Sequence, residues 1–292
     1  TAFAGIFQVQ PGHVVKVQRQ GGLLRTSGHK YWDLDFPKAH ERDPSISEEE
    51  HINAIRSSLL EAIEMRLVAD VPVGCYLSGG IDSCSILGLA AAVNQTPVKA
   101  FTIGFDDSRY DETDIAKEMA EATGAEQDVM RLSGDDLYDH FETTLWHTER
   151  TIYNTLGVAK YLMSRHVRHV NYKVVLTGEG SDELFAGYPA FRRDMFLHGS
   201  DGGDGDQRQK RLDQANALVT GAMLAAKPVE DPHLTAAVGF TPSCLQPWLA
   251  CAPLVPGLLA EDRREAVAGY EPGKAIAATL DRAQLEERHV LD

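Results

Sequence analysis

The sequence predicts an α/β fold built around a doubly wound parallel sheet. Short apolar runs alternate with helical patterns throughout residues 70–190, an order that favours a parallel sheet with helices on both faces. Two of these runs lead directly into turns that combine glycines with carboxylates, at residues 78–83 and 178–183. No repeat period is present, which argues against a solenoid or a propeller.

Residues 1–33 show the pattern of a β-hairpin. Four apolar residues stand two apart around a Pro-Gly turn, at the spacing of one strand face: Phe7, Val9, Val15 and Val17. About thirty residues of hairpin cannot make a core alone. We therefore expect this piece to end a larger β-rich domain or to pack on the segment that follows.

The first long helix is predicted to follow a polar linker at residues 36–47. Ser47 and Glu50 have the spacing of a capping box. The Asp-Val-Pro sequence at residues 70–72 ends the helix, because the residue before a proline disfavours helical backbone. Apolar side chains at helical spacing predict one core-facing stripe: Ile52, Ile55, Leu59, Ala62, Ile63 and Leu67.

The remaining elements of the α/β region are short. Apolar runs predict buried strands at residues 71–77, 98–105, 126–132 and 172–178. Helical patterns lie between them, at residues 85–93, 111–124, 133–148 and 157–170. Gly124 predicts the end of the second of these helices.

The last third of the chain carries weaker patterns. Residues 199–210, rich in glycine and aspartate, predict a flexible loop or linker. Residues 208–292 are rich in Ala and Leu and predict helices broken by prolines. The Gly-Lys pair within "EPGKAIAATL" is interpreted as the start of a helix.

The composition is that of an ordinary soluble globular protein with a formal net charge of −15. A polyanionic partner such as duplex DNA is disfavoured, because phosphate neutralisation needs a basic face. No apolar run approaches the roughly 20 residues that span a bilayer. Four cysteines without a C-x-x-C pair fit a reducing cytoplasm and are expected to be small buried side chains. The chain begins with Thr1 and ends in a polar helical run, so we expect a fragment.

The turn at residues 78–83 has the features of a phosphate-binding loop. Its two glycines let the backbone approach an anion, and the following helix offers unpaired N–H groups and the positive end of its dipole. Ser78 and Ser83 add hydroxyl groups. The Lys of a Walker A loop is missing, and Asp82 would repel a phosphate unless a cation lay between them, which implies Mg²⁺. A plain strand–helix turn with Asp82 as a surface cap is the alternative.

The second turn favours the functional interpretation. Glu179, Asp182 and Glu183 crowd within five residues after a buried strand. Crowded carboxylates repel one another, which costs stability unless a metal or a proton-transfer role compensates. Both turns of a doubly wound sheet would open on the same edge. Asp82 and Asp182 are then predicted to share one magnesium, and Glu179 to act as a base.

Two stretches carry a family resemblance. "LSGGIDSC" at residues 77–84 resembles the pyrophosphate-binding loop, or PP-loop, of the N-type ATP pyrophosphatases. "VLTGEGSDELFAGY" at residues 175–188 is similar to the second signature of one branch, the synthetase domain of glutamine-dependent asparagine synthetases. The resemblance covers about residues 1–193 and includes "LVADVPVGCYLSGGIDS", "FTIGFDD" and "AKYLMSR".

The resemblance also implies a domain organisation. Residues 1–40 would be the end of a glutaminase-like β domain with its linker, the hairpin being a remnant of that domain. Residues 41–198 would form the synthetase domain of the ATP-pyrophosphatase type. Residues 199–292 would be a loop and a helical part of the same domain, truncated.

The implied activity is that of an ATP-dependent carbon–nitrogen ligase of amino-acid biosynthesis. Such an enzyme activates aspartate as β-aspartyl-AMP, releases pyrophosphate, and uses glutamine-derived ammonia to form asparagine and AMP. Glu179 would accept a proton from the attacking amine, and Asp82 and Asp182 would bind Mg²⁺. The residues that would hold ATP and its pyrophosphate are Leu77, Ser78, Gly79, Gly80, Asp82, Ser83, Ile103 and Gly178.

Two departures from the family pattern leave the substrates open. The stretch "WHTERTIYN" at residues 146–154 differs from the acidic, proline-containing segment near the acceptor pocket of standard asparagine synthetases. The N-terminal cysteine nucleophile of the glutaminase is missing. One alternative is an amidotransferase or cyclising amide synthetase for another acid, and another is a non-catalytic nucleotide-binding remnant. The expected partners are small-molecule substrates, with no nucleic acid and no membrane, and a homodimer is one option.

Overall fold

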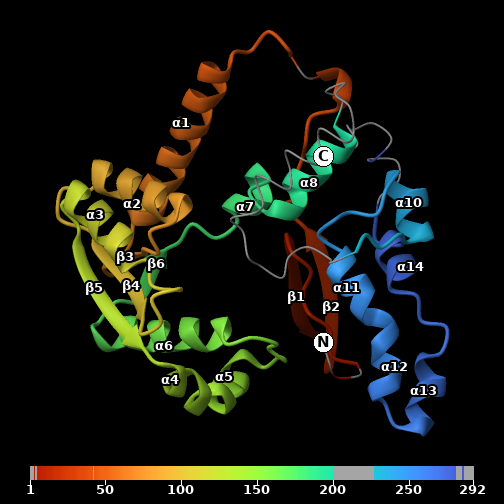
Figure 1. The fold of residues 1–292 in the computed structure, drawn as a ribbon. Helices are drawn as coiled ribbons and strands as arrows, with labels where there is room; N and C mark the ends of the chain where they lie inside the picture. The colour runs from red at the N-terminus through yellow and green to blue at the C-terminus, as the bar shows by residue number, and fades with distance from the viewer. Residues whose placement is uncertain (1–2, 4, 42, 200–226, 281–284, 286–292) are drawn as a thin grey trace. The chain divides into compact units, whose positions relative to one another are not determined.

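The computed structural model describes residues 3, 5–41, 43–199, 227–280 and 285, so most of the predicted loop at residues 199–210 lies outside the described residues. The chain forms two compact units (Figure 1). The first comprises residues 1–33 and 45–179, and the second comprises residues 34–44 and 180–292. The predicted domain boundaries at residues 40 and 198 stay predictions.

The N-terminal hairpin consists of β1 (His13–Gln20) and β2 (Leu23–Lys30), which pair antiparallel. A hairpin was predicted here, but its predicted turn was wrong. The strands reverse at Gly21 and Gly22, whose φ angles are +58° and +82°. Two positive φ angles in a two-residue turn match the natural twist of the paired strands, and glycine adopts them without steric cost.

The first unit contains a four-stranded parallel sheet, which confirms the predicted fold class. The strands are β3 (Val73–Tyr76), β4 (Lys99–Phe105), β5 (Glu126–Leu132) and β6 (Val174–Leu176). Their order across the sheet is β5-β4-β3-β6, with every neighbouring pair parallel. The chain winds outward from β3 to β5 and then returns to the other side of β3. The order therefore reverses between β3 and β6, where open α/β sheets bind their ligands.

Successive strand residues supply two cores on opposite faces of the sheet. Cys75 and Ala100 point into the core on one face, whereas Tyr76 and Phe101 point into the core on the other. Helices α1 (Glu48–Leu67), α2 (Ile81–Val93) and α3 (Thr113–Thr123) cover the first face (Figure 1). Helix α6 (Leu156–His169) covers the second, on which its buried residues pack.

Local sequence patterns correctly predicted the start of α1 and the end of α3. The Ser47 Oγ accepts a hydrogen bond from the Glu50 N–H at 3.3 Å, and the Glu50 carboxylate accepts one from the Ser47 N–H at 2.8 Å. This confirms the capping box at the start of α1. Helix α3 ends at Gly124 with a left-handed φ of +67°, as predicted.

Two helix predictions were wrong in detail. Ile52 and Ile55 belong to the predicted core stripe of α1 but are 46% and 41% exposed, whereas Ile63 is buried. Only the C-terminal half of α1 packs on the first core. The single helix expected at residues 133–148 is divided at His140 into α4 (Gly134–Asp139) and α5 (Phe141–Thr148). The apolar period did not reveal this break, because Leu137 and Phe141 keep helical spacing across it and both pack on the second core.

The second unit is helical in its described part. Its elements are η1 (Ala39–Glu41), α7 (Ser181–Phe185), α8 (Pro189–His198), α10 (Pro232–Val238), α11 (Gln246–Cys251), η2 (Ala252–Leu254), α12 (Val255–Leu258), α13 (Glu261–Val267) and α14 (Pro272–Ala277). Helix α14 confirms that "EPGKAIAATL" starts a helix. Its Gly273 lies against the Asp231 carboxylate, which caps α10 by accepting from the N–H groups of His233 and Leu234.

The four cysteines are free thiols. Cys75 is buried in the first core, and this burial raises the pKa of its thiol to about 11. Cys84 and Cys244 are half-buried, but Cys251 is exposed, so the expectation of a buried side chain was wrong at that position. Among the described helices, none has both the length and the apolar character of a membrane span.

A buried carboxylate, Asp194, joins α8 to the segment before α11. Only 7% of Asp194 is exposed, and its Oδ2 accepts a hydrogen bond from the Ser243 N–H at 2.8 Å. Burial raises the pKa of Asp194 above its ordinary value, and the Ser243 hydrogen bonds partly oppose this. The folded state thus holds the proton more tightly than the unfolded chain. Stability from this group is greatest below the ordinary pKa near 4 and falls as pH rises through the raised pKa.

The Asp194→Asn variant tests this pH dependence. Asn keeps an acceptor for the Ser243 N–H and removes the buried charge. We expect the melting temperature of the variant to rise relative to the wild type between pH about 4 and about 7.5, as measured by thermal unfolding. Asp262→Asn, at an exposed position of α13, is the control and should show no such trend. If the melting temperatures of variant and wild type differed by the same amount at both pH values, the raised pKa of Asp194 would be contradicted.

Candidate functional site

The first predicted turn connects β3 to α2 at the carboxyl end of the sheet. The Leu77 N–H donates to the Phe101 carbonyl at 2.9 Å and extends the β3–β4 pairing one residue beyond the strand. Leu77 is buried, so the turn is anchored on the core side. Helix α2 then begins at Ile81, with Gly80 as its N-cap. Its first N–H groups are directed toward this edge, as an anion site requires.

The hydroxyl groups of the two serines form hydrogen bonds within the turn. The Ser78 N–H donates to the Ser83 Oγ at 3.2 Å, and the Gly80 N–H donates to the Ser78 Oγ at 3.2 Å. The Ser83 hydroxyl donates to the Gly80 carbonyl at 3.0 Å. The serines therefore shape the turn in this structure. To donate to a phosphate, Ser83 would have to exchange its bond to Gly80 for one to the ligand.

Gly79 is the position in this turn that requires glycine. Its φ is +89°, and an added Cβ would lie 3.2 Å from Ala116 N and from Glu112 O at the start of α3. A side chain here would combine unfavourable backbone with a crowded contact. The turn is thus held against α3 as well as above β3.

Gly178 brings the second predicted turn onto the first. A Cβ built on Gly178 would lie 2.7 Å from Asp82 Cβ and 2.9 Å from Ser83 N. The backbone after β6 therefore packs directly on the first turn of α2. The two motifs, about one hundred residues apart in sequence, meet at the reversal point of the sheet, where ligands of such sheets bind.

Glu179 follows this contact and pairs with a cation. Its Oε1 lies 2.5 Å from the Nζ of Lys160, which comes from α6. Both side chains are substantially exposed, at 68% and 50%. The sequence motifs described above assigned no role to Lys160. Its position could have been anticipated, because a crossover helix starts near the carboxyl edge of a parallel sheet and Lys160 lies near the start of α6.

The other predicted carboxylates lie in the second unit. Asp182 is in α7, where its carboxylate lies against Gly187 and its carbonyl accepts from the Gly187 N–H at 3.0 Å. The Glu183 Oε1 accepts a hydrogen bond from the Tyr188 hydroxyl at 2.9 Å. Within the described residues no group of three or more His, Cys, Asp or Glu side chains converges as a metal cage. The shared magnesium of Asp82 and Asp182 stays a prediction.

Ile103 lies near the end of β4, opposite Met130 of β5. It is half-buried and packs in the cores under α6. Its predicted contact with the adenine or ribose stays a prediction.

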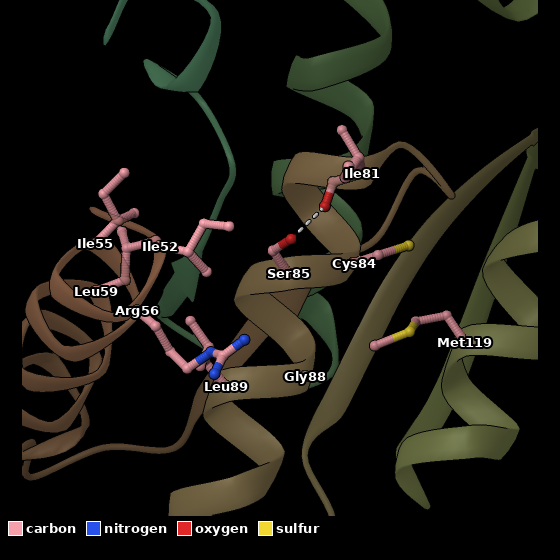
Figure 2. Close-up of a pocket in the computed structure, with 10 residues that line it drawn as sticks. All are labelled: Ile52, Ile55, Arg56, Leu59, Ile81, Cys84, Ser85, Gly88, Leu89 and Met119. Carbon is pink, nitrogen blue, oxygen red and sulfur yellow. Dashed lines mark hydrogen bonds between the residues drawn. The ribbon is translucent and has the colours of Figure 1, made fainter. Parts of the chain in front are cut away.

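An open groove lies beside the start of α2 (Figure 2). Its volume is about 590 Å³, and mostly apolar side chains from α1, α2 and α3 line it. Ile81, Cys84 and Ser85 face the groove, and their spacing places them on one side of α2. Asp82 and Ser83 lie on a different side, toward Gly178. The groove is thus separate from the paired turns.

The comparison with protein families decides the assignment. A family model described as asparagine synthase matches residues 54–272, a range that includes both turns. The chain belongs to the asparagine synthase family. This membership confirms the family resemblance that the two sequence motifs indicated.

The relatives that this chain matches differ in their names. Amidase chyE of Penicillium rubens is 40% identical over 209 residues, covering 67% of this chain and 30% of the relative. Asparagine synthetase 1 of Bacillus subtilis is 28% identical over 198 residues, covering 68% of this chain and 30% of the relative. The chain thus spans about 30% of the length of these relatives. An NH3-dependent NAD synthetase from Campylobacter jejuni overlaps 78% of this chain and 97% of its own, at 14% identity and a TM-score of 0.35.

Proposed function

We propose that the chain is the nucleotide-activating part of an ATP-dependent amide-forming ligase. The reaction we favour converts aspartate to asparagine through β-aspartyl-AMP, with ammonia derived from glutamine, and releases AMP and pyrophosphate. The observation that carries the proposal is the contact of Gly178 with Asp82 and Ser83. It joins the two family motifs at the reversal point of the sheet.

The first turn is assigned to the pyrophosphate of ATP. Because its glycines have no side chains, the backbone of this turn lies close to neighbouring elements. The start of α2 supplies N–H groups for phosphate oxygens. Leu77 and Gly178 flank this turn, in agreement with a role beside the nucleotide. Asp82 is a hard oxygen ligand suited to Mg²⁺, and we assign Asp182 as its second carboxylate. The metal would offset the charge of the phosphates when bound.

Glu179 is assigned as the base of the amide-forming step. The amine nitrogen forms a bond to the acyl carbon, and the bond from that carbon to the AMP oxygen breaks with its electron pair. The nitrogen must lose a proton, which passes to the Glu179 carboxylate. Backbone N–H groups at the first turn would stabilise negative charge on the departing pyrophosphate in the earlier, activating step.

Another acid is the second candidate substrate. Amidase chyE, the 40%-identical relative, is not named as an asparagine synthetase. The segment at residues 146–154, which is expected near the acceptor, also carries exposed Trp146 and Tyr153. An acceptor larger or less polar than aspartate fits these side chains. We place either enzyme in the cytoplasm, with a homodimer as one option.

The experiment uses the full-length gene product. It is given ATP, Mg²⁺, aspartate and ¹⁵N-ammonium, and mass spectrometry follows labelled asparagine and AMP. Labelled asparagine with matching AMP supports asparagine synthesis. AMP that depends on another acid of a test panel supports the second candidate. An absence of acid-dependent AMP with every acid would contradict the ligase proposal and favour a nucleotide-binding remnant.

A further inference from the structure

The ion pair between Lys160 and Glu179 lies at the end of the two joined motifs. The Nζ of Lys160 is 2.5 Å from the Oε1 of Glu179. An ion pair this exposed contributes little to the stability of a folded protein. We therefore do not assign this ion pair to holding α6 in place.

The backbone of α6 around Lys160 is held in place by buried neighbours and hydrogen bonds. The neighbours Ala159 and Leu162 are buried in the second core. The Ser164 hydroxyl donates to the Lys160 carbonyl at 2.8 Å and lies 3.2 Å from the hydroxyl of Tyr76. Tyr76 is the last residue of β3 and stands two residues before Ser78, where the first turn begins. The backbone of Lys160 is thus tied to the strand that carries the predicted pyrophosphate loop.

The backbone at Glu179 is also constrained by packing and a hydrogen bond. Gly178 packs against the first turn of α2, and the Glu179 N–H donates to the Thr177 Oγ1 at 3.4 Å. The Glu179 side chain itself is mostly exposed and can adopt several rotamers. Lys160 restricts this freedom, because its ammonium group holds one of the two carboxylate oxygens.

We propose that Lys160 is a positioning residue for Glu179 in the amide-forming step, an inference that rests on the proposed function. Lys160 holds Oε1, which leaves Oε2 as the oxygen that accepts the proton of the attacking amine. A fixed carboxylate is closer to the geometry of proton transfer than one that samples several rotamers. Misplacement of a catalytic group by about 1 Å can lower a rate by about a hundredfold.

The test separates positioning from binding. The variant Lys160→Met of the full-length protein removes the charge, and Lys160→Arg keeps it. Acid-dependent exchange of labelled pyrophosphate into ATP measures the activation step, and labelled amide measures the second step. We expect Lys160→Met to lower the rate of amide formation about ten- to hundredfold and to leave pyrophosphate exchange unchanged. We expect Lys160→Arg to recover most of the lost rate of amide formation.

Lys117→Met is the matched control. Lys117 forms an exposed ion pair with Glu121 on α3, at 3.8 Å. This control should leave both activities and the melting temperature unchanged. The positioning role is overturned if Lys160→Met forms amide at the wild-type rate. It is also overturned if this variant loses pyrophosphate exchange and amide formation to the same extent. Either result leaves the proposed function in place. A wild-type protein that lacks both activities overturns the proposed function and this inference with it.

Discussion

Glu179→Gln is expected to abolish most amide formation while the activation of the acid continues. Gln has nearly the size of Glu, but its amide cannot accept a proton from the attacking amine. Loss of a general base typically lowers a rate by about 10²- to 10⁴-fold, and we expect an effect in this range. Acid-dependent exchange of pyrophosphate into ATP should stay near the wild-type rate, because it precedes the amine. Single-turnover formation of labelled amide measures the loss.

Glu183→Gln is the control for this experiment. Glu183 lies in the same motif, but its carboxylate accepts from the Tyr188 hydroxyl. Gln offers an oxygen to the same hydroxyl, so amide formation should stay within about twofold of the wild type. Equal amide formation by the wild type and Glu179→Gln would remove Glu179 from the mechanism and leave the base unassigned.

Gly178→Ala is expected to separate the two turns. The added Cβ would lie 2.7 Å from Asp82 Cβ and 2.8 Å from the Asp82 carbonyl carbon. Contacts this short cannot be relieved by a side-chain rotation, because the obstruction is the backbone of the first turn of α2. Overpacking of this kind costs about 1–3 kcal/mol in unfolding free energy. We expect that cost in denaturant unfolding, together with a loss of ATP affinity in calorimetric titration.

Gly134→Ala provides the matched substitution. Gly134 begins α4, and an added Cβ there meets no atom within 4 Å. Alanine favours helical backbone over glycine, so this variant should be at least as stable as the wild type and should bind ATP equally well. If Gly178→Ala were to bind ATP like Gly134→Ala, the close approach of the two turns would have no part in nucleotide binding.

Local signals in the sequence predicted the elements of the sheet unit well. The capping box of Ser47 and Glu50 and the left-handed Gly124 depend on neighbouring residues only, so their spacing was sufficient. The sheet could be predicted because parallel strands need helical crossovers, and the sequence alternates in that way. Both turns were expected at one edge of this sheet, and the contact of Gly178 with Asp82 brings them together.

Features that depend on distant residues could not be predicted in the same way. Ile52 and Ile55 line the open groove between α1, α2 and α3, and the apolar period does not encode that this space stays unfilled. The partner of Lys160 is 19 residues away in the sequence and comes from another element. Asp194 is buried by a segment about fifty residues later, where no local pattern indicates a buried acid.

The pairing of β3 with β6 also determines when the site can exist during synthesis of the protein. Val73 pairs with Val174, whereas β4 and β5 are close neighbours along the chain. Chains fold as they emerge from the ribosome, and contacts that close long loops form slowly. A nascent chain therefore carries its first glycine turn well before β6 can dock beside β3. At the ATP site proposed above, nucleotide binding would then report that β6 is in place.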